Sequence, residues 1–233
     1  MPSISLKLKL TFSAILISVV LLVAQTFSQF HFLRGELTQR IEHEQFTLLS
    51  ELARHLDNEI SERLLALEEA SHTISAAQLS NNATIETHLR RETVLLSLFD
   101  DLYIFSPEGT LLVDWPVKPG RRQLDMSGRD YIKGVRETLK PFISQPVLGK
   151  ATQQPIVVLA APVLDAQGKL IAIMGGVLNL QKANLIGRVS NRKVGESGYF
   201  YIVSTDWKII SHPDKARLMQ AAAGPTENPA LAR

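Results

Sequence analysis

The sequence predicts an α+β protein in which a membrane-spanning helix and a long amphipathic helix precede a sheet of antiparallel strands. Three observations lead to this fold class. No ionisable side chain occurs from Leu10 to Phe30, and apolar residues then recur at helical spacing as far as Ala77. After Asp100, short strand-like runs alternate with turns, and strands joined by hairpins are typical of antiparallel sheets.

The composition is that of a globular protein, since 45% of the 233 residues are hydrophobic and 21% are charged. The formal net charge of +2 is not clustered, and basic pairs such as Arg121-Arg122 have no aromatic neighbours, so no nucleic-acid partner is expected. Cysteine is absent, which excludes disulfides and thiolate chemistry. The six histidines include no pair three or four residues apart, so we expect neither a metal site nor a cofactor.

The first predicted element is a membrane anchor over residues 10–32. A helix over the uncharged run is about 31 Å long, which matches the hydrocarbon core of a bilayer. Lys7 and Lys9 precede it, so the positive-inside rule keeps residues 1–9 in the cytoplasm and sends the rest outward. A cleaved signal peptide and a buried core helix are the alternatives. The anchor is favoured because no clear small-x-small cleavage site ends the segment and the helical spacing continues.

The second predicted element covers residues 33–99 and is a long stalk helix followed by a second helix. Neither Gly nor Pro occurs from Glu36 to Ser106, and Ser80, Asn81 and Asn82 interrupt the helical pattern. The apolar stripe fits either a dimer seam or a packing face for the sheet, and both interpretations stay open. The stripe consists of Leu37, Ile41, Leu48, Leu52, Leu56, Ile60, Leu64, Leu67, Ile74 and Ala77, and the second helix adds Ile85, Leu89, Leu96 and Phe99.

The third predicted element is an antiparallel sheet over residues 100–190. Pro107 and Gly109 stand in a tight turn between the first two strands, and Asp165 to Gly168 form a second such turn. A short helix from about Gly128 to Lys140 separates the two hairpins. The predicted strands are Leu102–Phe105, Thr110–Val113, Phe142–Ile143, Pro155–Val163 and Lys169–Leu180.

A smaller unit is predicted over residues 191–233, after a helix at Lys182–Val189. It contains a loop at Gly195–Gly198 and a last helix that starts at His212-Pro213-Asp214. Two strands and a helix cannot bury a core of their own, so this unit is expected to be incomplete as it stands. Its hairpin strands are Tyr199–Val203 and Lys208–Ile210.

Several motifs follow one another in a recognisable order. They are the long first helix and hairpin, Gly128 to Lys133 (GRDYIK), Ile143 to Val147 (ISQPV), Val158 to Val163 (VLAAPV), Asp165-Ala166-Gln167-Gly168, Gly195 to Tyr201 (GESGYFY) and Ser211-His212-Pro213. Over about Glu36 to Leu218 the chain resembles double Cache (dCache, PDC-type) sensor domains of bacterial transmembrane receptors. The resemblance implies a membrane-distal PAS-like module at 100–190 that binds a small ligand, a membrane-proximal module, and a second transmembrane helix that leads to a cytoplasmic output. Residues 191–233 are expected to be the start of the membrane-proximal module, truncated in this chain. A homodimer is expected because receptors of this kind signal as dimers, and the helical stripe is the only hint of it in the sequence.

The resemblance also implies a ligand site at the start of the short helix. There the Arg129 guanidinium can grip a carboxylate and the Tyr131 ring can close the side of the pocket. The alternative is that Arg129 pairs with Asp125 or Asp130 at the surface while Tyr131 is a core residue. The full candidate set for ligand binding is Arg129, Tyr131, Lys133, Asp114 and Ser144.

Departures from the family pattern bear on the ligand class. Amino-acid-binding members carry Arg, a spacer, Trp and Tyr in this helix, and an Asp on the late strand that receives the ammonium group. Here Tyr131 and Ile132 replace the aromatic pair, and Val177 stands near the place of the Asp. A small carboxylate without an amine, such as an organic acid, is therefore the expected ligand.

The predicted function is ligand sensing in the periplasm for a protein of the bacterial inner membrane. The motifs are most like those that precede diguanylate cyclase output, with a chemoreceptor or a histidine kinase as the alternative. A stand-alone membrane-anchored binding protein and an extracytoplasmic enzyme are alternatives of other classes. No catalytic residue is expected, because no nucleophile is paired with a base and Tyr199 stands where a nucleophile elbow would need Gly.

Overall fold

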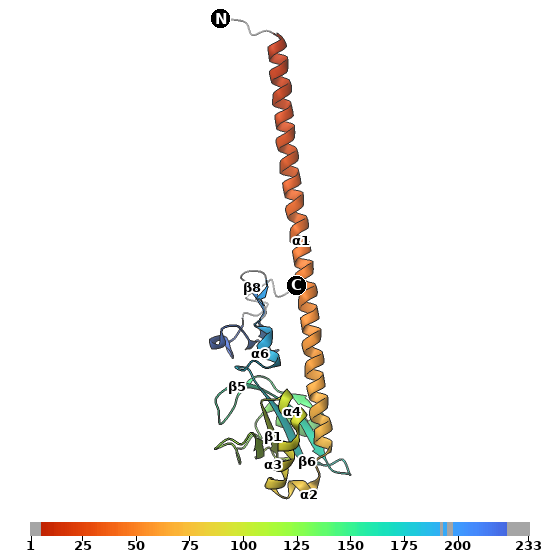
Figure 1. The fold of residues 1–233 in the computed structure, drawn as a ribbon, viewed down its shortest axis with the longest axis vertical. Helices are drawn as coiled ribbons and strands as arrows, with labels where there is room; N and C mark the ends of the chain where they lie inside the picture. The colour runs from red at the N-terminus through yellow and green to blue at the C-terminus, as the bar shows by residue number, and fades with distance from the viewer. Residues whose placement is uncertain (1–5, 192, 195–197, 223–233) are drawn as a thin grey trace. The chain divides into compact units, whose positions relative to one another are not determined.

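The structure is a computed structural model and describes residues 6–191, 193–194 and 198–222, without the side chains of residues 6–14, 30–43 and 194. The chain forms two compact units, Met1–His55 and Leu56–Arg233. Helix α1 (Leu6–His72) begins in the first unit and ends in the second (Figure 1).

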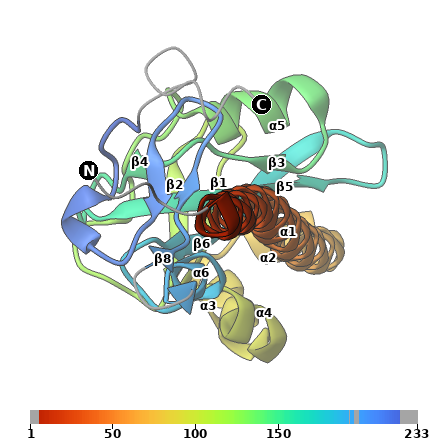
Figure 2. The same cartoon turned by 90° about the horizontal axis from the view of Figure 1, so that it is seen from above.

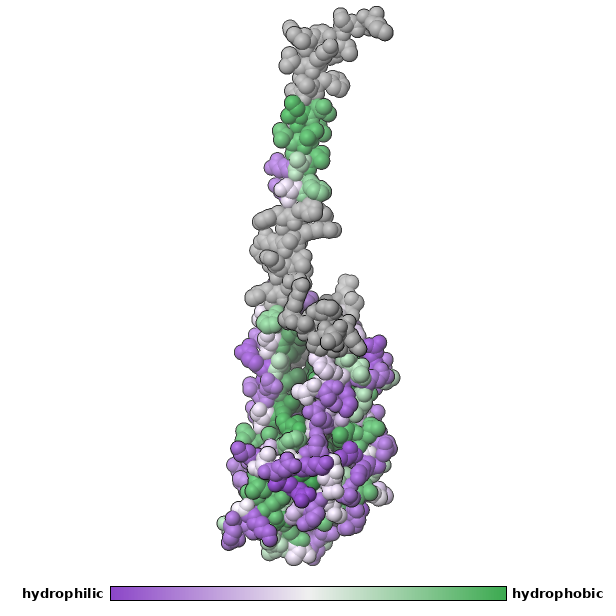
Figure 3. All heavy atoms as spheres, turned by 180° about the vertical axis from the view of Figure 1, so that it is seen from behind, coloured by the Kyte–Doolittle hydropathy of each residue, from purple (hydrophilic) through white to green (hydrophobic). Residues whose placement is uncertain are grey.

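The described part of the first unit is helical, and its apolar side chains over residues 15–23 face solvent. Because consecutive residues of a helix point in all directions, the exposed apolar side chains at 15–23 surround the helix. Figure 3 shows them as a green band. Among the described residues, none of the helices has an apolar stretch long enough to cross a membrane. The predicted anchor at 10–32 includes side chains at 10–14 and 30–32 that lie outside the description. More than half exposed are Ile15, Leu16, Ile17, Val19, Val20, Leu21, Leu22 and Val23.

In the second unit α1 ends at His72, earlier than the interruption predicted at Ser80–Asn82. The reason is a capping box, in which the Ser75 hydroxyl accepts a hydrogen bond from Gln78 N and the Gln78 side chain accepts one from Ser75 N. Asn81 then caps the next helix by accepting a hydrogen bond from Ala83 N at 2.9 Å. The helices that follow α1 are α2 (Ala76–Leu79), α3 (Asn82–Arg91) and α4 (Thr93–Leu98).

A six-stranded antiparallel sheet with the order β2-β1-β6-β5-β3, in which β4 also pairs with β5, forms the centre of this unit. The predicted antiparallel α+β class is thereby confirmed. Strand β4 was not predicted, and the other strands begin and end within two residues of their predicted bounds. The strands are β1 (Asp101–Phe105), β2 (Leu111–Trp115), β3 (Phe142–Ile143), β4 (Val147–Leu148), β5 (Pro155–Leu164) and β6 (Leu170–Asn179).

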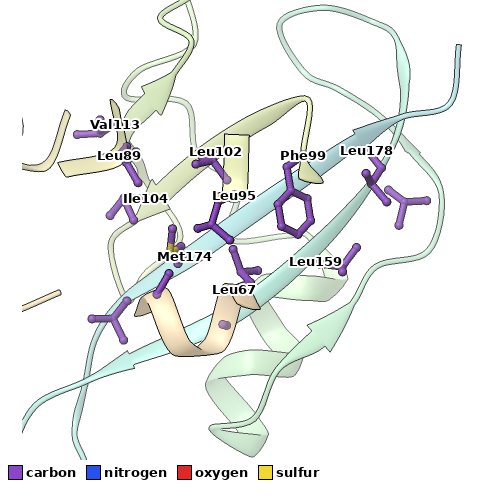
Figure 4. Packing of buried hydrophobic residues seen from close by; sticks show 14 of the residues in the cluster. Leu67, Leu89, Leu95, Phe99, Leu102, Ile104, Val113, Leu159, Met174 and Leu178 are labelled. Atoms are coloured by element: carbon purple, nitrogen blue, oxygen red, sulfur yellow. The ribbon is translucent and has the colours of Figure 1, made fainter. Parts of the chain in front are cut away.

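One face of the sheet packs against the helices that precede it. Alternate residues of a strand point to opposite faces, and Leu102 of β1 and Met174 of β6 meet Leu67, Leu95 and Phe99 on this face (Figure 4). Burying a leucine side chain completely contributes about 1.5–3 kcal/mol. Within residues 60–67, therefore, the apolar stripe of α1 is a packing face for the sheet.

The other face of the sheet is covered by α5 (Asp130–Thr138), which lies across the strands from α3 and α4 in Figure 2. Ile132 and Val135 of α5 are fully buried against Phe105 and Ile173. The first residues of α5 are thus held over the sheet at the end of a long loop from β2. This arrangement positions the candidate ligand site.

The remaining chain holds short elements. The predicted hairpin is present between β9 and β10, but Tyr199 belongs to a separate pair, β7 with β8. The predicted last helix is a single 3-10 turn, which Asp214 caps. Residues 195–197 of the predicted loop lie outside the described residues. The elements are α6 (Leu185–Val189), β7 (Lys193–Val194), β8 (Gly198–Tyr199), β9 (Ile202–Val203), β10 (Ile209–Ser211) and η1 (Lys215–Arg217).

Candidate ligand-binding site

A small cavity lies on the α5 face of the sheet. Its volume is about 20 Å³, enough for about one water molecule. A larger ligand therefore has to displace part of the wall, which includes segments without regular structure, among them the loop at 149–152. The lining residues are Tyr103, Leu111, Arg121, Leu124, Met126, Arg129, Tyr131, Val147, Gly149, Lys150, Ala151, Thr152 and Ile156.

The charged side chains that line the cavity are all basic. They are Arg121, Arg129 and Lys150, and no Asp or Glu belongs to the lining in the described part of the chain. A cation in a partly apolar cavity favours an anionic ligand, because the low local dielectric strengthens their attraction. The site is therefore suited to an anion.

Arg129 stands at the N-cap position of α5 and is half-buried. Its Nη2 donates a hydrogen bond to the backbone oxygen of Leu148 at 2.7 Å, which ties the helix start to β4. The alternative surface pairing is not formed with Asp130, whose two carboxylate oxygens accept hydrogen bonds from the backbone N–H groups of Tyr131 and Gln145. Among the described residues, Leu148 is the hydrogen-bond partner found for the Arg129 guanidinium, so its other N–H groups are available to a ligand.

Two tyrosines line the cavity. The Tyr131 ring lies 5.8 Å from the Phe105 ring, and the Tyr103 ring meets the same Phe105 ring edge-on at 5.8 Å. Burial raises the pKa of Tyr131, and burial together with the Asp101 carboxylate raises the pKa of Tyr103. Both phenols stay neutral at physiological pH and can donate hydrogen bonds to an anion.

Arg121 also lines the cavity, and sequence reasoning missed it as a site residue. Its side chain is 5% exposed, and its Nη2 donates to Asp101 Oδ2 at 3.0 Å. The guanidinium carbon lies 5.2 Å from the centre of the Tyr103 ring, a cation-π contact. Its Nη1 is buried without a hydrogen-bond partner in the described part of the chain. A buried donor without a partner lowers the folding stability by about 1–3 kcal/mol, so a ligand group that accepts a hydrogen bond from Nη1 would be favourable here.

The predicted ligand residue Asp114 does not line the cavity but holds the loop that carries Arg121. It is fully buried, and its oxygens accept hydrogen bonds from Arg122 Nε at 3.0 Å and from the backbone N–H of Lys118 at 2.9 Å. Arg122 continues to Glu86 of α3 at 2.6 Å. An ion-pair chain therefore connects α3 with the cavity wall.

The family model of the Cache domain (dCache_1) matches residues 33–228. The chain belongs to the Cache domain family. The double Cache resemblance predicted from the sequence is confirmed by this match.

Relatives of this Cache domain are chemotaxis receptors. The chain is 25% identical over 217 residues to the methyl-accepting chemotaxis protein PctB of Pseudomonas aeruginosa, which covers 89% of the chain and 33% of PctB. It is 24% identical over 168 residues to TlpB of Bacillus subtilis, which covers 71% of the chain and 24% of TlpB. The chain thus spans a third or less of the length of these curated relatives.

Solved structures with this fold are ligand-binding domains. That of the Pseudomonas fluorescens chemoreceptor CtaA with L-isoleucine has a TM-score of 0.59 and 29% identity, covering 74% of this chain and 68% of that one. That of the Pseudomonas aeruginosa chemoreceptor PctC with GABA has a TM-score of 0.61 and 20% identity, covering 75% and 77%, and supports the fold alone. The similar proteins are thus ligand-binding sensor modules rather than enzymes.

In this Cache domain the five predicted site residues are divided. Arg129 and Tyr131 meet at the cavity, whereas Asp114 lies behind it. Lys133 is exposed and is not part of the lining. The Ser144 hydroxyl accepts a hydrogen bond from Val158 N at 2.9 Å, which ties the chain beside β3 to β5. Their ligand contacts stay predictions.

By the family resemblance, the apolar residue Val177 stands near the place of the ammonium acceptor. Val177 of β6 is fully buried and lies opposite Asp101 of β1 in the strand register. Asp101 is committed to Arg121 and to Lys118 Nζ at 3.1 Å. In the described part of the chain, no group of three or more His, Asp or Glu side chains is placed to hold a metal ion.

Proposed function

We propose that this chain is the periplasmic ligand-sensing part of a chemoreceptor anchored in the bacterial inner membrane, and that it binds a small carboxylate without an amine. The observation that carries the ligand assignment is a Cache-domain cavity lined by three basic residues and, within the described residues, by no acidic one. The Arg129 guanidinium receives the carboxylate, and the neutral Tyr131 phenol closes the site.

The chemoreceptor output is supported by the relatives. Both PctB and TlpB are methyl-accepting chemotaxis proteins. The diguanylate cyclase output that was favoured from the sequence has no such support, so its chemoreceptor alternative takes its place. Ligand binding then shifts an equilibrium between two receptor states, for which the ligand must prefer one state.

The ligand class is a narrower proposal. The domains of CtaA and PctB bind amino acids such as L-isoleucine and L-glutamine in their solved structures. An ammonium group buried in a cavity needs an anionic or hydrogen-bonding acceptor. In this chain Val177 offers none and Asp101 already holds two cations. The proposed ligand therefore has a carboxylate group and no amine.

Isothermal titration calorimetry on the full chain in detergent tests this assignment with matched pairs, propionate against alanine and succinate against aspartate. The amine-free member of each pair is expected to bind at least tenfold more tightly. Arg129→Gln is expected to weaken binding about 10- to 100-fold, because a charge-assisted hydrogen bond contributes about 1.5–3 kcal/mol.

Lys133→Gln is the matched control, since Lys133 is an exposed cation one turn along the same helix and is not part of the lining. It should leave the affinity unchanged. Binding of alanine and aspartate alone would contradict the ligand class, and the absence of binding to every carboxylate and amino acid tested would contradict the site.

A further inference from the structure

Arg121 is a buried cation with no role in the proposed binding of the carboxylate by Arg129. Its side chain is 5% exposed, whereas Arg129 is half-buried at the start of α5. Both side chains line the same cavity. The cavity therefore has one guanidinium at its rim and another in its interior.

The contacts of Arg121 fix its guanidinium and leave one nitrogen free. Nη2 is held by Asp101 Oδ2 at 3.0 Å, and the guanidinium lies over the Tyr103 ring. Nη1 lies 3.9 Å from Asp114 Oδ2, which is too long for a hydrogen bond. No other hydrogen-bond partner meets Nη1 within the described residues.

Asp114 is not free to turn toward Nη1. Its Oδ1 accepts from Arg122 Nε at 3.0 Å and its Oδ2 accepts from the backbone N–H of Lys118 at 2.9 Å. Turning the carboxylate would break these bonds in a fully buried place. Because Arg121 lines the cavity, a ligand group in the cavity is the acceptor that remains for Nη1, and three further lining residues, Leu111, Leu124 and Met126, are apolar.

We propose that Arg121 Nη1 binds a second anionic group of the ligand, so that the ligand is a short dicarboxylate held between Arg129 and Arg121. This inference rests on the proposed function and narrows its ligand class from carboxylates to dicarboxylates. A guanidinium whose position is set by other contacts recognises a carboxylate with little loss of side-chain freedom.

A dicarboxylate enters by opening the rim, because the cavity of about 20 Å³ has room for about one water molecule. Two hydrogen bonds join the two sides of the rim, the segments 148–150 and 125–129. Lys150 Nζ donates to the backbone oxygen of Asp125, and Arg129 Nη2 donates to the backbone oxygen of Leu148. A carboxylate that takes Arg129 Nη2 from Leu148 releases the second contact. The outer anionic group then opens the site for the inner one.

Calorimetry on the full chain in detergent, with succinate and propionate as probes, tests the inference. The natural protein is expected to bind succinate at least tenfold more tightly than propionate. Arg121→Lys keeps the charge beside Asp101 but loses the second nitrogen, so it should lower the succinate affinity to that of propionate and leave propionate unchanged. Arg136→Lys is the matched control, since Arg136 is an exposed arginine of α5 and is not part of the lining. It should leave both affinities unchanged.

The possible outcomes separate the two proposals. If neither acid binds, the proposed function fails and this inference fails with it. If propionate binds as tightly as succinate, or if the preference for succinate survives Arg121→Lys, the inference alone is overturned. If Arg121→Lys does not fold, the natural protein alone still tests the inference. Equal affinities of the natural protein for succinate and propionate would contradict a second carboxylate contact.

Discussion

The two cavity tyrosines give the folded state a dependence on alkaline pH. Burial raises the pKa of Tyr103 and Tyr131 above the ordinary value of 10.0. A group whose pKa is higher in the folded chain contributes stability below its unfolded pKa and loses it as the pH rises. The melting temperature should therefore fall above about pH 10, and the double variant Tyr103→Phe/Tyr131→Phe should show a smaller fall. Tyr201→Phe is the control, because Tyr201 is 45% exposed, and an equal fall in all three proteins would contradict the assignment.

Single residues of the site differ in how far the sequence could identify them. Arg129 and Tyr131 belong to a local motif at a helix start, and both line the cavity, while their ligand contacts stay predictions. Arg121 lies in a loop without periodicity, and its placement depends on Asp101, which is twenty residues earlier. A buried cation of this kind follows from long-range packing, which no local pattern encodes. The adjacent Arg121-Arg122 pair in a Pro- and Gly-containing loop was the available signal.

At the scale of elements, α5 reaches the sheet at a point where a glycine is required. A Cβ at Gly134 would meet the Phe142 ring of β3 at 2.3 Å, whereas a Cβ at Gly128 meets no atom within 4 Å. Gly134→Ala should destabilise the fold by about 1–3 kcal/mol and weaken ligand binding, because α5 carries Arg129 and Tyr131. Gly128→Ala should change stability by less than about 0.5 kcal/mol. Chemical denaturation of both variants measures the difference, and equal stabilities would show that α5 is not packed in this way.

The sequence predicted the helices and strands correctly where the periodicity of apolar side chains was strong. The long strands β5 and β6 and the first hairpin were identified within two residues because apolar runs and turn residues mark them. The end of α1 and strand β4 were not identified from the sequence. Ser75 ends the helix through a capping box that leaves the apolar stripe intact, and two residues of β4 are too few for an alternating pattern to be visible.

At the scale of the whole molecule, the proposed anchor and its orientation decide on which side of the membrane the cavity lies. Large apolar side chains surround α1 over 15–23 and are more than half exposed, a distribution that suits lipid rather than water. We expect the chain to stay with membranes at high salt. Leu21→Asp/Leu22→Asp should release part of it, because Asp at the centre of a spanning helix costs about 2.5–3.5 kcal/mol. Phe46→Asp, which lies on α1 at 69% exposure outside that stretch, is the control.

The natural lack of cysteine makes the orientation testable with single thiols. Gln167→Cys lies at the exposed tip of the β5–β6 turn, beyond the anchor, whereas Ser3→Cys lies before Lys7 and Lys9. In intact cells an inner-membrane-impermeant maleimide should label Gln167→Cys and spare Ser3→Cys until the inner membrane is opened, because the two lysines keep the N-terminus inside. Labelling in the reverse order, or recovery of the natural chain in the cytosol, would contradict a periplasmic sensor, since the cavity could not then meet a ligand from outside.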